Sequence, residues 1–205
     1  MAPVAGLWHN PPVIKEGSMS DRNKAKLVSG GHKGAEAEFG RCAKRWGLNE
    51  DTLSFEGHQM EWSQDVRMLS AEELAKGDVS MEIVSQRLGR SYTNIQQIRR
   101  VVQSLFHMVK DTYEVFVIGW IQPDNTVQGG TGWGVELAKF FNRPVWAYDQ
   151  EKKGWFRWNG QAWEAGSPTL PERPFAGTGT RNLSEDGRRA IQALFQRSFG
   201  PPAKS

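Results

Sequence analysis

The pattern that most constrains the fold is a short apolar strand followed by a glycine-rich loop and a helix, and it occurs twice. The first copy runs from residues 26–28 through SGGHKG at 29–34 into a helical stretch that Gly47 should end. The second runs from residues 114–119 through GGTGWG at 129–134 into a helix over 135–142. Strands that alternate with helices predict an α/β domain with a mostly parallel sheet in three layers.

Other segments complete this prediction. Further strands are expected at residues 52–55, 81–84 and 145–148, and a long helix at 93–110. The tail differs in composition: residues 155–164 predict a small β-hairpin with a two-residue turn at Asn159-Gly160. A proline-rich linker at 167–174 then leads to a glycine cluster at 177–181 and to a terminal helix over 184–199, capped by Ser184.

The chain of 205 residues is long enough for one such domain, expected over residues 19–205. Residues 1–18 hold three prolines and no periodic pattern, and they end in Gly17-Ser18 just before Met19. We interpret them as a cloning leader or, alternatively, as a flexible arm. They lack the basic and apolar regions of a secretory signal, so the cytoplasm is the expected compartment.

Composition excludes several classes of protein. Cys42 is the one cysteine, which excludes an internal disulfide and any multi-cysteine metal site, and it falls on the apolar face of the first helix. The four histidines are scattered without ligand spacing, so no metal and no cofactor is expected. A net charge of +3 suits an anionic small molecule but is too weak to indicate a nucleic-acid partner. No apolar run is long enough for a membrane span.

The two glycine loops carry the expected chemistry. Backbone N–H groups at a helix start lack intrahelical partners, the helix dipole favours negative charge there, and glycine lets a phosphate approach closely. Both loops should lie at the carboxyl edge of the sheet, where open α/β sheets bind ligands. The candidate ligand-binding residues are Ser29, Gly30, Gly31, His32, Lys33, Gly34, Glu36, Gly129, Gly130, Thr131, Gly132 and Trp133.

Each candidate also has a simpler structural interpretation. Glycines at strand–helix junctions often serve turn geometry alone, Glu36 suits the first turn of any helix, and Lys33 suits a solvated loop. Trp133 is harder to place in a core from within a glycine loop, which favours stacking on a base. The cluster at 177–181 resembles an anion-binding turn but would serve equally as helix capping.

Standard nucleotide fingerprints are absent. GGHKGAE does not fit the G-x-G-x-x-G pattern of dinucleotide-binding enzymes, and GGTGWGVE lacks the Lys-Ser/Thr pair of a P-loop. Hydride-transferring enzymes and ordinary nucleoside triphosphatases are therefore disfavoured.

SGGHKGAE and GGTGWGVE together resemble the SLOG superfamily of Rossmann-like proteins, which includes the Lonely-guy phosphoribohydrolases and the DNA-processing A proteins. The phosphoribohydrolase signature is G-G-x-G-T-x-x-E, and Gly129, Gly130, Gly132 and Glu136 fall on its glycine and glutamate positions. Trp133 replaces the threonine of the signature, and nine residues separate strand from loop where those enzymes have almost none. The resemblance covers about residues 24–149 and implies a Rossmann-like domain and self-association.

The resemblance also implies hydrolysis of the N-glycosidic bond of a nucleoside monophosphate by a glutamate and an arginine. Glu136 would stabilise positive charge on the ribose, and Arg99 or Arg100 would hold the phosphate. The simpler interpretations are a first-turn acid for Glu136 and a solvated helix face for the arginines.

Three functions remain open on the sequence alone. The first is a protein that binds a nucleotide or nucleoside derivative and hydrolyses it, or transfers a group, at the N-glycosidic bond. The second is a non-catalytic sensor or sequestering protein with the same ligand, favoured by the missing threonine. The third is a protein-interaction module that uses the tryptophan-rich hairpin.

Overall fold

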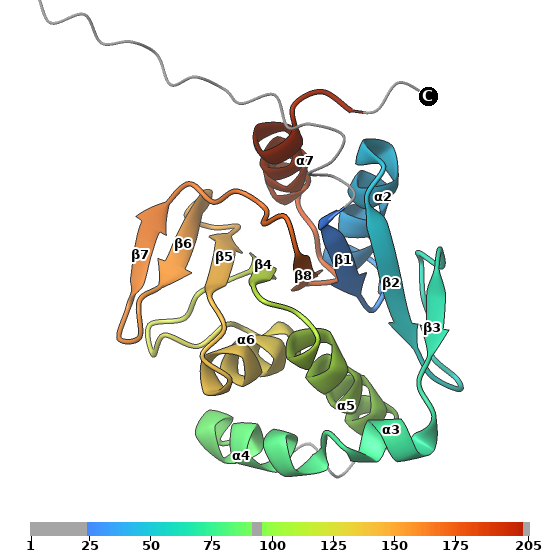
Figure 1. Ribbon diagram of the computed structural model, residues 1–205. Helices are drawn as coiled ribbons and strands as arrows, with labels where there is room; N and C mark the ends of the chain where they lie inside the picture. The colour runs from blue at the N-terminus through green and yellow to red at the C-terminus, as the bar shows by residue number, and fades with distance from the viewer. Residues whose placement is uncertain (1–23, 92–95, 203–205) are drawn as a thin grey trace, which may run out of the picture.

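An eight-stranded sheet runs through the part of the chain that the structure describes, residues 24–91 and 96–202 of a computed structural model (Figure 1). Its strand order is β3-β2-β1-β8-β4-β5-β6-β7. The strands are β1 Lys26–Ser29, β2 Asn49–Ser54, β3 Val66–Met68, β4 Val115–Gly119, β5 Val145–Asp149, β6 Gly154–Trp158, β7 Trp163–Gly166 and β8 Pro174–Gly179. From β3 to β5 along this order, each strand pairs in parallel with its neighbour. The last two pairs, β5 with β6 and β6 with β7, are antiparallel.

Helices cover both faces of the sheet, which confirms the predicted three-layer α/β architecture. The helices are α2 Ala35–Trp46, α3 Ala71–Ala75, α4 Asp78–Leu88, α5 Gln96–Lys110, α6 Thr131–Phe140 and α7 Glu185–Phe199. One layer holds α2 and α7, and the other holds α3 to α6 (Figure 1). Each layer has its own apolar cluster against the sheet. Strand β4 is buried along its whole length because both layers cover it.

Local sequence explains several boundaries. Gly47 ends α2 in the left-handed conformation at φ 70°, as expected for a glycine C-cap. Ser184 caps α7, and its hydroxyl accepts a hydrogen bond from the N–H of Gly187 at 3.0 Å. None of the described helices is long and apolar enough to cross a membrane. Residues 1–18 lie outside the described residues.

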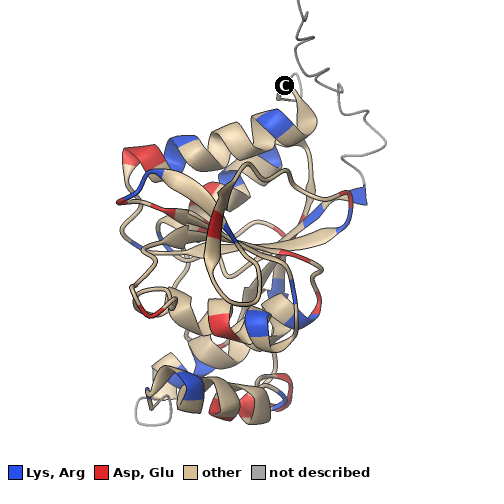
Figure 2. Cartoon of the chain, turned by 90° about the vertical axis from the view of Figure 1, so that its left-hand side faces the viewer, with Lys and Arg blue, Asp and Glu red and all other residues tan. Residues whose placement is uncertain are grey.

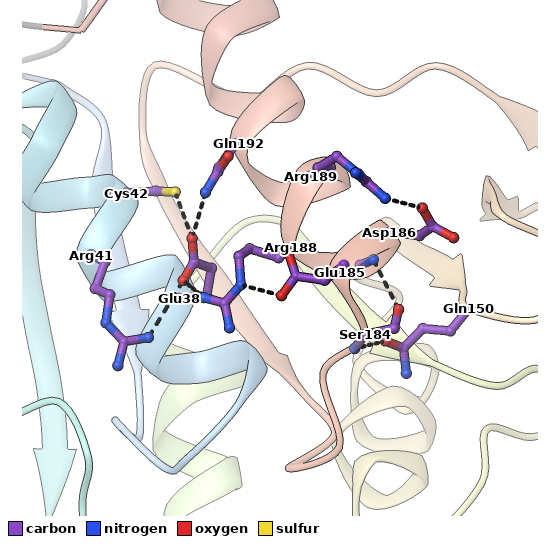
Figure 3. A network of polar contacts seen from close by, with 11 residues as sticks. Glu38, Arg41, Cys42, Gln150, Ser184, Glu185, Asp186, Arg188, Arg189 and Gln192 are labelled. Atoms are coloured by element: carbon purple, nitrogen blue, oxygen red, sulfur yellow. Dashed lines mark hydrogen bonds and ion pairs between the residues drawn. The ribbon is translucent and has the colours of Figure 1, made fainter.

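The outer helices α2 and α7 are joined by a buried carboxylate (Figure 3). Glu38 of α2 forms an ion pair with Arg188 of α7 and accepts from Gln192 Nε2 at 3.0 Å, while Arg41 lies 3.4 Å away on its own helix. Cys42 lies beside this carboxylate and is buried, as its place on the apolar face predicted. Burial, followed by the charge of Glu38, raises the pKa of the Cys42 thiol to about 12, so the thiol stays protonated.

Residues of both charge signs occur along both helical layers, as the ribbon colours of Figure 2 show for the side of the molecule that it presents. Arg189 pairs with Asp186 on α7, and Arg99 pairs with Asp78 between α5 and α4. This mixture agrees with the small net charge of +3.

The tail of the chain corrects the sequence prediction most strongly. The glycine cluster at 177–181 was expected as a turn after a linker, but residues 174–179 form β8, which lies between β1 and β4. A Cβ on Gly177 would lie 2.7 Å from the Phe39 ring, so glycine is needed for α2 to pack on this strand. The tail therefore completes the centre of the sheet.

Three smaller predictions are also wrong. Residues 81–84 are part of helix α4, which buries Met81 and Val84 three positions apart. Helix α6 begins at Thr131, so residues 131–134 are its first turn and not loop. The hairpin pairs Trp158 with Trp163, which leaves a four-residue connection, 159–162. The Asn159 side chain closes it by accepting from the N–H groups of residues 161 and 162, each at 2.8 Å.

Candidate functional site

A pocket of about 440 Å³ lies where β1, β8 and β4 end. The segment after β1 contributes His32 and Glu36, and the end of β8 with the residues after it contributes 178–182. The segment after β4 contributes Trp120 and residues 128–131. An apolar wall comes from one side of α5, with Trp133 beside it; the α5 residues are Ile98, Val101, Val102 and Leu105. The two predicted loops and the third glycine cluster therefore face one pocket.

The first loop contributes side chains to the pocket, because its backbone is covered by neighbouring segments. A Cβ on Gly31 would lie 2.2 Å from the Trp62 carbonyl oxygen, and one on Gly34 would lie 2.5 Å from that of Thr180. The N–H of Ala35, at the start of α2, donates to the Thr180 carbonyl at 3.0 Å. These glycines therefore allow neighbouring backbone to pack closely against the loop.

Glu36 is a buried carboxylate in the wall of the pocket. Its Oε1 accepts from Thr178 Oγ1 at 2.7 Å, and its Oε2 accepts from the His32 N–H at 3.1 Å and lies 3.1 Å from His32 Nδ1. Burial favours the neutral acid, but the hydrogen bonds and charge of His32, with the Thr178 hydroxyl, hold the pKa of Glu36 below its usual value. Glu36 is therefore an ionised carboxylate in the pocket at neutral pH.

His32 also meets a residue that the sequence analysis did not select. His58 Nε2 lies 2.9 Å from His32 Nε2, and His58 Nδ1 lies 3.2 Å from Ser54 Oγ. The Phe55 ring stacks on His58 with ring centroids 4.5 Å apart. Burial, then the charge of His32, lower the pKa of His58 to about 4, although Glu36 acts in the opposite direction.

A signal for this pair exists in the topology rather than in the spacing of histidines. His32 follows β1 and His58 follows β2, and these strands are parallel neighbours. Residues that follow adjacent parallel strands meet at one edge of the sheet, however far apart they are in the chain.

The second loop has an open backbone. Gly129 has φ +71°, and a Cβ built on Gly129 or Gly130 would meet nothing within 4 Å. Among the described residues, no backbone carbonyl accepts a hydrogen bond from the N–H of Gly130 or Thr131. Arg90 Nη1 holds the loop from outside by donating to the Gly129 carbonyl at 2.9 Å. The start of α6 therefore presents amide donors to the pocket.

Trp133 is a core residue that also lines the pocket, although a core position was expected to be difficult for a ring within a glycine loop. Its side chain is 6% exposed and belongs to the apolar cluster beneath the sheet, and it also lines the pocket. Gly132 is buried against the Val127 carbonyl oxygen, which would lie 2.2 Å from a Cβ. The Trp-Gly part of the motif thus packs the first turn of α6, and the Trp133 side chain also forms part of the pocket lining.

The structure does not bring the predicted catalytic residues together at this pocket. Glu136 pairs with Lys139 at 2.7 Å, and Lys139 lies 3.9 Å from the centre of the Trp158 ring. Arg99 contacts Asp78 at 2.7 Å, and Arg100 donates to the Glu56 carbonyl at 3.0 Å. Neither Glu136 nor either arginine lines the 440 Å³ pocket.

The other candidates lie close by without lining the pocket. Gly30 leaves room for Glu36, whose Oε2 would lie 2.7 Å from a Cβ at that position. Ser29 is buried, and its hydroxyl has no hydrogen-bond partner among the described residues. Lys33 is exposed. The described residues contain no group of three or more His, Cys, Asp or Glu side chains that could hold a metal ion.

Comparison with known proteins gave no significant match to a family model, a curated protein or a solved structure.

Proposed function

We propose that this pocket binds a nucleotide or nucleoside derivative. The observation that carries the proposal is the combination of an apolar wall with two amides that donate to no backbone carbonyl of the described residues. The amides belong to Gly130 and Thr131, and the wall is the apolar side of α5. Amide donors at a helix start suit a phosphate, and a mostly apolar wall with a few polar groups suits a base and sugar.

Different parts of the proposed ligand would contact different walls of the pocket. The phosphate would lie over Gly130 and Thr131, and the base would lie against the apolar side of α5. Glu36 would accept a hydrogen bond from a ribose hydroxyl, because a carboxylate keeps acceptor capacity beyond its contacts with Thr178 and His32.

Any hydrolysis or transfer at the N-glycosidic bond would depend on Glu36 rather than Glu136. Breaking that bond develops positive charge on the ribose, which an ionised carboxylate stabilises. Glu36 is the carboxylate that lines the pocket, while Glu136 faces Lys139.

A non-catalytic sensor or sequestering protein is the second candidate. It is favoured by the position of Glu136, since the residue that the SLOG resemblance assigns to catalysis does not line the pocket. The tryptophan hairpin gives less support to a protein-interaction module, because Lys139 already lies over its Trp158 and Trp163 rings.

The test is a thermal-shift panel of nucleosides and their 5′-mono- and diphosphates, with released base measured in parallel. A nucleotide at about 100 times its Kd should add about 2.7 kcal/mol to the free energy of unfolding, and its nucleoside should add less. Released base indicates the enzyme, and saturable stabilisation without base indicates the sensor. If no member of the panel raises the melting temperature, the proposal is wrong.

The variant that isolates the amide site is Gly130→Ala. Gly130 has helical φ −61° and open space around its Cβ position, so alanine should leave the unliganded melting temperature unchanged. Its methyl group would stand where the phosphate approaches, so we expect the apparent affinity for the nucleotide, measured by thermal shift, to fall at least tenfold. Gly154→Ala is the matched control on β6, where the nearest atom would lie at an ordinary 3.6 Å.

A further inference from the structure

A second cavity of about 380 Å³ adjoins the first. The two share His32, Ile98, Val101 and Arg181 in their linings, and the second adds Phe55, His58 and Gln59. A ligand in the first pocket could therefore extend past His32 and Arg181 into the second.

The polar lining of this cavity is basic or neutral. Arg181 is exposed at its mouth, and the two imidazoles and the Gln59 amide supply the other polar groups. No aspartate or glutamate is among the described residues that line it. Glu36 lies behind His32, and its oxygens are engaged by His32 and Thr178.

We propose that this second cavity is an anion subsite, which takes a phosphate group of the nucleotide-like ligand and binds it together with one proton on the His32–His58 pair. The inference rests on the proposed function for the identity of the ligand, while the subsite itself can be tested with a simple anion. The second cavity would limit the ligand to nucleotide derivatives that carry a further anionic group, at the end of the molecule away from Gly130.

The geometry explains why one proton is involved. The two Nε2 atoms lie 2.9 Å apart, so one of them must donate to the other and both cannot carry an N–H in that contact. His32 Nδ1 faces Glu36, and His58 Nδ1 faces the Ser54 hydroxyl, which can either donate or accept. With His32 Nδ1–H donating to Glu36, His58 Nε2–H fills the contact between the rings. An added proton therefore goes to His58 Nδ1, where the Ser54 hydroxyl turns from donor to acceptor, and it makes the pair a cation beside Arg181.

The charges around the pair set the direction of the coupling. The titratable or charged groups that act on His58 are His32, Glu36 and Arg181. Burial, then His32 and Arg181, disfavour a charge on His58 in the unliganded protein, and only Glu36 favours it. An anion in the cavity would offset the repulsion from Arg181, so its binding should raise the pKa of His58 and be accompanied by uptake of one proton. Anion affinity should then fall by up to about tenfold for each unit of rising pH.

Sulfate is the probe, because its charge does not change between pH 5.5 and pH 8. Sodium sulfate would be titrated into the full chain at both pH values, with chloride at matched ionic strength as the reference. Thermal shift would report binding, and imidazole NMR would report His32 and His58. We expect sulfate to stabilise the protein saturably, with an affinity at least tenfold higher at pH 5.5 than at pH 8 and with a raised pKa for His58.

Arg181→Gln and His58→Gln should each abolish the pH-dependent part of this response. His107→Gln should keep the pH-dependent response, because His107 of α5 lines neither cavity. Its Nε2 lies 2.7 Å from the Glu73 carbonyl oxygen of α3. Arg181→Lys is the second variant if the glutamine variant folds poorly, and it should retain weakened binding.

The outcomes separate the two proposals. The subsite is wrong if sulfate shifts neither imidazole in the wild-type chain, or if its affinity is equal at both pH values. If the subsite binds sulfate but no nucleotide stabilises the protein, the proposed function fails and the anion subsite stands. If nucleotides bind without competition from sulfate, the proposed function stands and the subsite is not part of it.

Discussion

Glu36 is the residue on which most of the candidate site depends. Through its two oxygens it joins α2 to Thr178 at the end of β8 and to His32 after β1. A buried carboxylate is retained only where hydrogen bonds or charges replace its lost hydration, and these contacts do so. The residue therefore holds together three parts of the pocket wall.

Glu36→Gln tests this role. Loss of the charge-assisted hydrogen bonds should lower the free energy of unfolding at pH 7 by about 1–3 kcal/mol. The wild-type pKa is below the unfolded value of 4.5, so its stabilisation is complete above 4.5 and is lost as pH falls through the folded value. The variant should lack this acid-sensitive component in urea titrations from pH 7 to pH 3. Glu72→Gln, on exposed α3, is the control.

His58 should make a separate contribution to pH dependence. Its pKa is about 4 in the folded chain and 6.5 as a reference, so the unfolded state binds its proton first as pH falls. The free energy of unfolding should therefore decrease as the pH falls from 6.5 to about 4. Below pH 4, His58 should cause no further decrease. Chemical unfolding of His58→Gln across that range should show a shallower decrease, and an unchanged slope would contradict the assignment.

Residue-scale prediction from sequence succeeded where the local pattern decides the outcome. Cys42, Gly47 and Ser184 have their expected roles because burial on a helix face and capping depend on nearby residues. His58 was missed because its partner is 26 positions away and meets it only through the pairing of β1 with β2.

At the scale of elements, β8 decides how the sheet is assembled. It pairs with β1 on one side and β4 on the other, so it connects two groups of strands that have no direct pairing across it. Helix α7, which follows β8, packs on α2 through the ion pair between Arg188 and Glu38 (Figure 3). Strand β8, which comes late in the sequence, therefore lies in the middle of the sheet.

Ending the chain at Gly166 tests this arrangement. Without β8 and α7, the facing edges of β1 and β4 and the apolar side of α2 would be uncovered. We expect loss of cooperative unfolding by circular dichroism, and recovery when a peptide of residues 167–205 is added. Cooperative, native-like unfolding of the shortened chain alone would show that β8 is dispensable.

The same strand shows where sequence prediction of elements fails. PFAGTG has a single β-branched residue, Thr178, which stands between two glycines, so the segment resembles a turn. It is a strand because Gly177 permits the approach of Phe39 and both neighbours supply hydrogen-bonding partners. Residues 81–84 show the opposite error, because a strand was predicted and a helix formed. A short apolar run fits strand and helix equally until packing selects one.

For the whole molecule, the two apolar clusters lie on opposite faces of one sheet. Trp46 and Trp155 belong to the cluster with α2 and α7, and Trp133 belongs to the one with α5 and α6. Strands β4 and β8 contribute residues to both clusters, so neither face can lose its packing without exposing a shared strand.

The two faces should therefore unfold together. Tryptophan fluorescence and far-ultraviolet circular dichroism should give coincident urea transitions, because a shared central sheet couples both layers. Trp133→Phe would leave fluorescence dominated by the remaining tryptophans, and its transition should still coincide with circular dichroism. Separate midpoints would show that the layers are independent.

The position of β8 has a consequence for biosynthesis. Thr178 and Arg181 come late in the chain, yet they stand between loops made much earlier. A ribosome must therefore synthesise the chain at least as far as Arg181 before all walls of the pocket are present. A chain that stopped before β8 would lack both the complete pocket and the pairing that joins β1 to β4.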